Sequence, residues 1–118
     1  MIDNIDILKN VTILYAEDEA DLRDVTSSIL KSFTKNQYIA TNGKEAYDLF
    51  LEHEDDIDLI ITDINMPILN GLDFIKKVKE INLNIPVIVT TAFSNKEYLL
   101  EAIDIGVDKY VLKPIDIA

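Results

Sequence analysis

The segment Leu59–Gly71, LIITDINMPILNG, changes character at Asp63. Apolar and β-branched residues precede the aspartate, which predicts a buried strand over Asp58–Thr62. Pro67 lacks a backbone N–H and disfavours helical geometry in the residue before it, so we expect the chain after Asp63 to stay in a loop. Gly71 then allows the loop to turn into a helix. The segment therefore predicts a strand, a loop that begins at a carboxylate, and a helix.

The same alternation continues on both sides of this segment. Short apolar runs predict further strands over Val11–Ala16, Gln37–Ala40, Val87–Thr91 and Lys109–Leu112. Helical spacing of apolar residues predicts helices over Ala20–Phe33, Lys44–His53, Leu72–Ile81 and Lys96–Ile105. The apolar positions are Leu22, Val25, Ile29 and Phe33 in the first helix, Ala46, Leu49 and Phe50 in the second, and Ile75, Val78 and Ile81 in the third. The expected end signals are Asn42 and either Ser94 or Asn95 as N-caps, and Gly106 after the last helix.

Strands with continuous apolar runs are buried on both faces, which indicates a parallel sheet with helices on each side. Right-handed crossovers leave few topologies for such a chain. The predicted fold class is α/β: a flavodoxin-like, doubly wound, five-stranded parallel sheet of order 2-1-3-4-5, with its switch point between the first and third strands. We expect one domain over residues 11–118, after an N-terminal extension of residues 1–10.

Composition excludes several classes of function. The chain has 118 residues, of which 48% are hydrophobic, and this is enough for a core. Its 22 acidic and 11 basic residues give a net charge of −11, so direct nucleic-acid binding by this domain is not expected. No apolar run approaches the roughly 20 residues of a membrane span, so a membrane partner is not expected either. The absence of cysteine and of a secretory signal pattern favours the cytoplasm.

Polar residues stand at the carboxyl ends of four predicted strands, where ligands bind in open α/β sheets. These residues are Glu17 and Asp18, then Asp63, then Thr91, then Lys113. Carboxylates about 4 Å apart repel each other by about 4 kcal/mol per pair at an effective dielectric near 20, so the group calls for a cation. Oxygen ligands suit Mg²⁺, or the similar Mn²⁺, and the loop before Pro67 leaves the Asn65 carbonyl free as a further ligand. Acids, a divalent cation, a lysine and a hydroxyl together predict a site for a phosphoryl group on Asp63.

Each of these residues also has an ordinary structural interpretation. Glu17 and Asp18 are able to stabilise a helix start, and Asp63 is able to bind backbone N–H groups in a loop. Thr91 fits a strand interior, and Lys113 fits an exposed surface. Four complementary groups at four different strand ends favour the functional interpretation over these separate ones.

The sequence resembles the receiver domain of two-component response regulators over about residues 11–117. The matching motifs are YAEDEADLR (Tyr15–Arg23), TDINMPILNGLDFI (Thr62–Ile75), VTTAF (Val89–Phe93) and KYVLKP (Lys109–Pro114). Together, their order and spacing are specific to this family.

The resemblance implies roles for individual residues. Asp63 is the expected phosphoacceptor, and Asp18 and the Asn65 carbonyl are expected Mg²⁺ ligands beside it. Glu17 stands where the family commonly has aspartate, and it is expected to act through water. The residues expected to bind the phosphoryl group and to switch are Thr91, Lys113 and Tyr110. The family usually has a cis peptide bond before Pro114, and Pro67 and Gly71 are expected to shape the loop.

The resemblance also implies that the residues two positions after Asp63 and Thr91 tune the lifetime of the phosphoryl group. These residues are Asn65 and Phe93, and we expect Phe93 to shield the acyl phosphate. The expected donor is a sensor histidine kinase or a histidine phosphotransfer protein. Enzymatic activity is expected only as self-phosphorylation and self-dephosphorylation at Asp63.

The family usually has a fifth helix after the segment that ends at Pro114, and we expect this chain to lack it. We therefore expect one face of the sheet to be partly uncovered, with a homodimer or an output domain of a parent protein as possible covers. Two alternatives to phosphoryl acceptance stay open. One is a receiver-like interaction module that is never phosphorylated. The other is an aspartyl-phosphate phosphatase, although such an enzyme needs a second aspartate where Asn65 stands.

Overall fold

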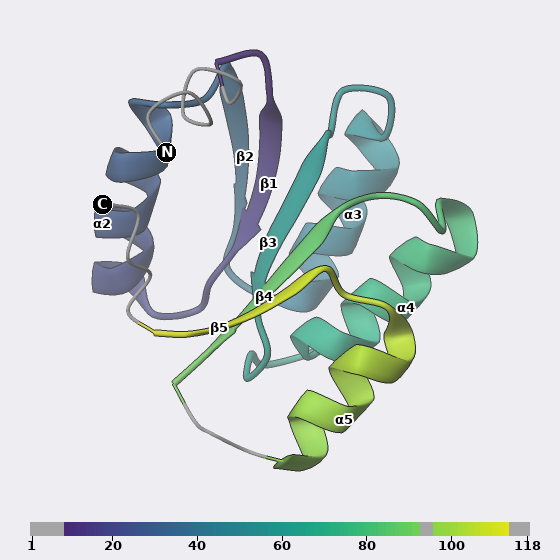
Figure 1. Ribbon diagram of the computed structural model, residues 1–118. Coiled ribbons are helices and arrows are strands. Elements are labelled where there is room, and N and C mark those ends of the chain that lie inside the picture. The colour runs from purple at the N-terminus through teal and green to yellow at the C-terminus, as the bar shows by residue number, and fades with distance from the viewer. Residues whose placement is uncertain (1–8, 93–95, 114–118) are drawn as a thin grey trace.

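The structure, a computed structural model, describes residues 9–92 and 96–113. Within these ranges strands and helices alternate as the sequence predicts (Figure 1). The strands are β1 (Thr12–Ala16), β2 (Asn36–Ala40), β3 (Leu59–Asp63), β4 (Val87–Thr91) and β5 (Lys109–Leu112). The helices are α2 (Ala20–Lys31), α3 (Gly43–His53), α4 (Gly71–Ile81) and α5 (Lys96–Ile105). No helix in the described part of the chain is long and apolar enough to span a membrane.

The five strands form one parallel sheet of order β2-β1-β3-β4-β5, which confirms the predicted α/β fold class. Because β1 and β3 are neighbours, their carboxyl ends meet at the same edge of the sheet. In the register, Ala16 pairs with Thr62 and Asp63 pairs with Thr90. Glu17 and Asp63 therefore leave the sheet side by side at the switch point.

Helices cover both faces of the sheet, but unequally. Figure 1 shows α3, α4 and α5 on one face and α2 on the other. The larger apolar core lies under the three helices and includes Phe50, Phe74 and Val89. The smaller core lies under α2 and consists of Ile13, Tyr15, Leu30 and Ile61. The central strand β1 is buried along its whole length, as a strand between two helical layers should be.

Side-chain caps fix where two of the helices begin. Asn42 Oδ1 accepts a hydrogen bond from the Glu45 N–H at 2.8 Å, which confirms Asn42 as the N-cap of α3. Asn70 caps α4 in the same way, through the Asp73 N–H at 2.9 Å. Gly106 follows α5 with a φ of 93°, as expected for a helix-ending glycine. The two proposed caps of α5, Ser94 and Asn95, lie outside the described residues.

The prediction of which side of α2 faces the sheet is wrong by part of a helical turn. Val25 is 60% exposed and Ile29 is 38% exposed, whereas Thr26 and Leu30 are buried. In this orientation the Thr26 side chain hydrogen-bonds the Tyr15 side chain. The helix also ends at Lys31, before Phe33.

One predicted core position of α4 is also wrong. Ile75 and Val78 are buried as predicted, but Ile81 is 42% exposed. Ile81 is the last residue of the helix. The buried positions that the spacing did not include are Leu72 and Phe74.

The face beside α2 retains exposed apolar area. Among the described residues, α2 is the helix on this face (Figure 1), and its Val25 and Ile29 are exposed. The described strands contribute Leu59 and Ile88, which are partly buried there.

Candidate functional site

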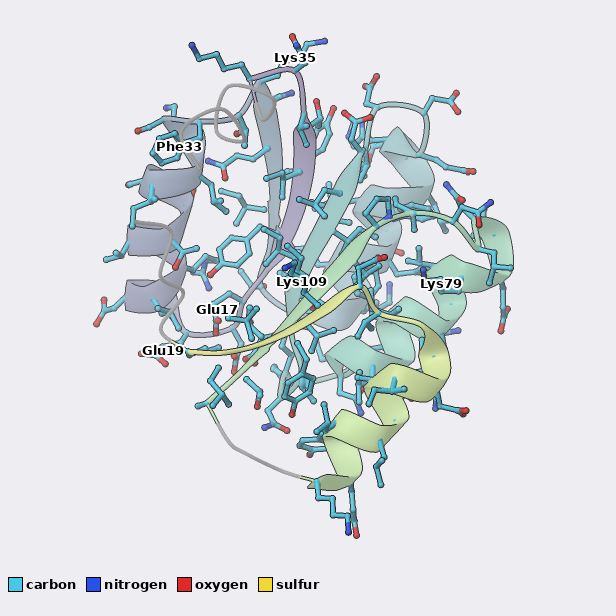
Figure 2. All side chains as sticks on the ribbon, viewed as in Figure 1. Glu17, Glu19, Phe33, Lys35, Lys79 and Lys109 are labelled. Atoms are coloured by element: carbon cyan, nitrogen blue, oxygen red, sulfur yellow. The ribbon has the colours of Figure 1, made fainter. Side chains whose placement is uncertain are left out.

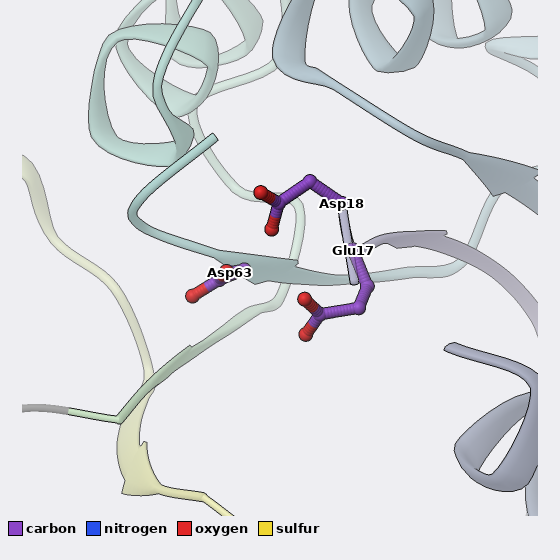
Figure 3. Close-up of side chains that lie close together, drawn as sticks. All are labelled: Glu17, Asp18 and Asp63. Atoms are coloured by element: carbon purple, nitrogen blue, oxygen red, sulfur yellow. The ribbon is translucent and has the colours of Figure 1, made fainter. Parts of the chain in front are cut away.

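Three carboxylates converge at the carboxyl edge of the sheet. Asp63 is the last residue of β3, and Glu17 and Asp18 directly follow β1. One carboxylate oxygen from each residue lies within 4.8 Å of the others, and Figure 3 shows the three side chains gathered together. Glu17 is 1% exposed and Asp63 is 4% exposed, while Asp18 is exposed to solvent. Two of the three negative charges are therefore desolvated.

Lys113 lies between the two buried acids. Its Nζ is 2.7 Å from Glu17 Oε1 and 3.0 Å from Asp63 Oδ2. Both contacts are ion pairs, so the ammonium group neutralises part of the charge of each acid. The Lys113 N–H also donates to the Thr91 carbonyl at 2.8 Å, which fixes the lysine to the end of β4.

The surroundings shift the protonation equilibria of the acid and of the lysine. Burial raises the pKa of Asp63 to about 6; Lys113 opposes the rise, and the negative charge of Glu17 adds to it. Burial opposes the charge on Lys113, but Glu17 and Asp63 outweigh it and raise the pKa of the lysine. The charged form of Lys113 is therefore stabilised in the site, whereas the ionised form of Asp63 is destabilised by its burial.

Backbone and side-chain hydrogen bonds orient the acidic residues. Asp63 Oδ1 accepts from the Ile64 N–H at 2.8 Å, and Glu17 Oε2 accepts from the Glu19 N–H at 3.1 Å. Arg23 of α2 donates to the Glu17 carbonyl at 2.9 Å and so fastens the acidic loop to the helix. We did not predict this role of Arg23, although a single cation among acids in the segment Tyr15–Arg23 is a usable signal. Figure 2 shows Glu17 and Glu19 at one end of the sheet and Lys35 at the other.

Two close backbone approaches hold the loop that follows Asp63. The Gly71 N–H donates to the Ile64 carbonyl at 2.8 Å, and the Gly43 N–H donates to the Leu69 carbonyl at 3.0 Å. A Cβ atom on Gly71 would lie 1.9 Å from the Asp63 carbonyl oxygen, and one on Gly43 would lie 2.0 Å from that of Leu69. Both positions therefore require glycine. We expected a loop-shaping role for Gly71, but no pattern in the sequence indicates that Gly43 contacts this loop.

The predicted switch residues lie on neighbouring strands. Thr91 is the last residue of β4 and is fully buried, and Tyr110 lies in β5 and is partly buried. The Tyr110 hydroxyl is buried without a hydrogen-bond partner among the described residues, and burial raises its pKa. The other two predicted site residues, Phe93 and Pro114, lie outside the described ranges.

A cavity of about 430 Å³ opens beside the acids. It is lined by Asp18, Glu19, Asp63, Asn65, Ala92 and Lys113. Tyr98 of α5 reaches the same edge and donates from its hydroxyl to Asn65 Oδ1 at 2.9 Å, a contact that the sequence did not predict. A larger cavity of about 540 Å³ lies between α2 and the edge strand β2, but it lacks converging acids, so we place the functional site at the smaller one.

The donor set at the carboxyl edge fits a divalent cation such as Mg²⁺. All three side chains offer carboxylate oxygens, the ligands that this ion prefers. Their oxygens are already close together, and two of them are buried, so a cation would offset a repulsion that is present in the fold.

Comparison with known proteins places this site in a family. A sequence profile described as "Response regulator receiver domain" matches residues 13–118. The response regulator SaeR of Staphylococcus aureus (strain USA300) is 35% identical over 102 residues, covering 86% of this chain and 43% of SaeR. The transcriptional regulatory protein ZraR of Escherichia coli (strain K12) is 30% identical over 107 residues, covering 91% of this chain and 24% of ZraR. The chain therefore spans less than half the length of these curated relatives.

Solved structures agree with this assignment. The N-terminal domain of an uncharacterized protein from Wolinella succinogenes is 38% identical and superimposes with a TM-score of 0.84, covering 90% of this chain and 84% of that one. The profile match extends over most of the sequence and includes every described strand end at the carboxyl edge. The chain therefore belongs to the family of response regulator receiver domains of two-component systems.

Proposed function

We propose that Asp63 accepts a phosphoryl group from a phosphohistidine of a partner protein. The observation that carries this proposal is the buried Asp63 carboxylate, paired with Lys113 and adjacent to Glu17 and Asp18 at the switch point. A carboxylate oxygen of Asp63 attacks the phosphorus, the P–N bond to histidine breaks, and the histidine ring keeps the electron pair. Hydrolysis later restores the carboxylate, because water attacks the phosphorus and the acyl P–O bond breaks to release inorganic phosphate.

The protein contributes position and charge to this transfer. Asp63 Oδ1 is held by the Ile64 N–H, while Oδ2 faces Lys113. The ammonium group of Lys113 can follow the negative charge onto the phosphoryl oxygens without leaving the site, because its backbone is bonded to Thr91. Phosphoryl transfer depends mainly on such positioning and neutralisation.

Asp18, Asp63 and the Asn65 carbonyl would hold Mg²⁺ or Mn²⁺, with Glu17 acting through water. When bound, the cation supplies positive charge to the phosphoryl oxygens and to the acids. In this proposal Asp18 has the most adaptable carboxylate, because it is exposed while Glu17 and Asp63 are buried.

Thr91 and Tyr110 are the proposed switch. A dianionic group on Asp63 attracts the Thr91 hydroxyl, and movement of Thr91 opens space for the Tyr110 ring. The unpartnered hydroxyl of Tyr110 supports this role, because a buried polar group without a hydrogen bond raises the free energy of the conformation that contains it. The change would bias α5 and β5 between two packings.

The proposed partners follow from the family. A sensor histidine kinase or a histidine phosphotransfer protein is the donor, docking beside the site on α2. The relatives SaeR and ZraR are longer than this chain, so a homodimer or an output domain of a parent protein is the proposed recipient of the signal. We propose no direct contact of this domain with nucleic acid, since its net charge is −11.

Incubation with acetyl phosphate and Mg²⁺, followed by intact-mass measurement, tests the proposal. We expect the wild-type chain to gain one phosphoryl group and the Asp63→Ala variant to gain none. A wild-type chain that stays unmodified would instead support an interaction module that is never phosphorylated. Repeated turnover of a phosphate ester would indicate a phosphatase.

A further inference from the structure

Tyr98 and Asn65 join two separate elements beside the acidic cavity. Tyr98 lies in the first turn of α5, and Asn65 lies in the loop after β3, two positions after Asp63. The Tyr98 hydroxyl donates to Asn65 Oδ1 at 2.9 Å. Asn65 is exposed and lines the cavity together with Asp63 and Lys113, so its amide lies where solvent reaches the site.

The chemistry of the amide gives this hydrogen bond a consequence for hydrolysis. An asparagine side chain has one oxygen that accepts hydrogen bonds and one NH₂ group that only donates them. Only the oxygen can accept a hydrogen bond from the O–H of an attacking water. Side-chain amides orient the attacking water in this way in phosphoryl hydrolysis by GTPases. In this structure that oxygen is engaged by Tyr98 and points toward α5.

We propose that Tyr98 is a positioning residue that lengthens the life of the acyl phosphate on Asp63. It does so by holding the amide oxygen of Asn65 away from the attacking water. The inference rests on the proposed function and adds to it a residue from α5 that acts through Asn65. The hydroxyl, and not the ring, is the active part, because the ring packs against the main core as an ordinary partly buried side chain does.

Tyr98→Phe tests this directly, because it removes the hydroxyl and keeps the ring. Each variant is phosphorylated with acetyl phosphate and Mg²⁺ and separated from the donor by rapid gel filtration. The loss of the phosphoryl mass is then followed with Mg²⁺ still present. We expect Tyr98→Phe to lose its phosphoryl group about fivefold faster than wild type, the factor that corresponds to about one net hydrogen bond.

Three further variants show whether Tyr98 acts through Asn65. In an Asn65→Ala background, Tyr98→Phe should change the rate no further, because the amide is already absent. Tyr47→Phe removes a hydroxyl from α3, which does not line the cavity, and should leave the rate unchanged. The NMR signals of the Asn65 side-chain amide in the unphosphorylated protein should shift in Tyr98→Phe and not in Tyr47→Phe.

The outcomes separate this inference from the proposed function. A Tyr98→Phe rate equal to or slower than wild type overturns the inference, and so does an acceleration that persists in the Asn65→Ala background. Unshifted Asn65 amide signals in Tyr98→Phe overturn it without any phosphorylation. A wild-type chain that never gains a phosphoryl group refutes the proposed function itself, and the inference falls with it.

Discussion

Replacing Ile68 should stabilise the domain, although the residue lies in the loop that follows Asp63. Ile68 has a φ of 73° and is the one non-glycine residue with a positive φ in the described part of the chain. The Leu69 N–H donates to the Pro67 carbonyl at 2.8 Å, so Ile68 is the central residue of a γ-turn of the rare, strained kind. A β-branched residue is poorly suited to this backbone geometry.

The expected gain follows from the backbone and from the exposure of the side chain. A positive φ costs an ordinary residue about 1 to 2 kcal/mol, and asparagine is several-fold enriched among the non-glycine residues that adopt it. Ile68 is 75% exposed, so its side chain contributes only about a quarter of the free energy of full burial. Its replacement therefore loses roughly 0.5 kcal/mol of hydrophobic stabilisation. Ile68→Asn should therefore stabilise the fold by about 1 kcal/mol, which raises the melting temperature of a domain of this length by about 4 °C.

Thermal unfolding followed by circular dichroism in metal-free buffer measures this change. Ile68→Val keeps the branched side chain and should give no gain. Leu83→Asn is a matched control, because Leu83 is 71% exposed but does not have a positive φ. A melting temperature for Ile68→Asn at or below that of wild type would refute the reasoning. An equal gain from Leu83→Asn would show that removal of exposed apolar surface, and not strain relief, is responsible.

Three further predictions concern the site and the loop that holds it. Since burial raises the pKa of Asp63 to about 6 from 3.8, its ionised form lowers stability. This loss is absent below about pH 4, grows as the pH rises toward 6, and reaches about 3 kcal/mol at neutral pH. Asp63→Asn should therefore raise the melting temperature in metal-free buffer at pH 7.5 but not at pH 4, and equal melting temperatures at pH 7.5 would contradict the assigned burial cost. Gly43→Ala should destabilise the fold by roughly 2 kcal/mol or more, since its Cβ would meet the Leu69 carbonyl and break that hydrogen bond. Gly106→Ala, with nothing within 4 Å of the new Cβ, should cost only about 1 kcal/mol from its positive φ and leave phosphorylation intact; equal losses in denaturant unfolding would rule out the loop contact. Finally, Phe93→Ala should shorten the life of the acyl phosphate in the intact-mass assay, and an unchanged rate would remove Phe93 as its shield.

The fold was predictable because most segments agree at every level. Continuous apolar runs such as Ile13–Ala16 fit only a strand buried on both faces, and the switch point then follows from the crossover rule. The gathering of Glu17, Asp18, Asp63 and Lys113 followed from the same step, because strand ends of a parallel sheet share one edge.

Contacts that depend on tertiary detail were not predictable in the same way. The orientation of α2 was missed because a threonine, Thr26, faces the sheet to bond with Tyr15, while the apolar Val25 does not. Tyr98 lies 33 positions from Asn65, and helical periodicity carries no information about which loop a side chain meets. The strain at Ile68 was missed because nothing in the residue itself indicates a positive φ; an asparagine or glycine there would have done so.

Several unfavourable features of this domain lie at the acidic edge of the sheet and in the loop that follows Asp63. Asp63 and Glu17 are buried acids, and Ile68 is held in a strained turn. Gly43 admits the backbone of Leu69 only because it has no side chain. Elsewhere in the described chain the helices α3 and α4 are capped and the core is apolar. Local costs persist where the surrounding structure imposes them, and they gather at functional sites. A cation or phosphoryl group that contacts these acids binds the folded state and not the unfolded one, so its binding free energy adds to stability. The groups that weaken the metal-free domain are thus the groups that make its stability respond to what occupies the site.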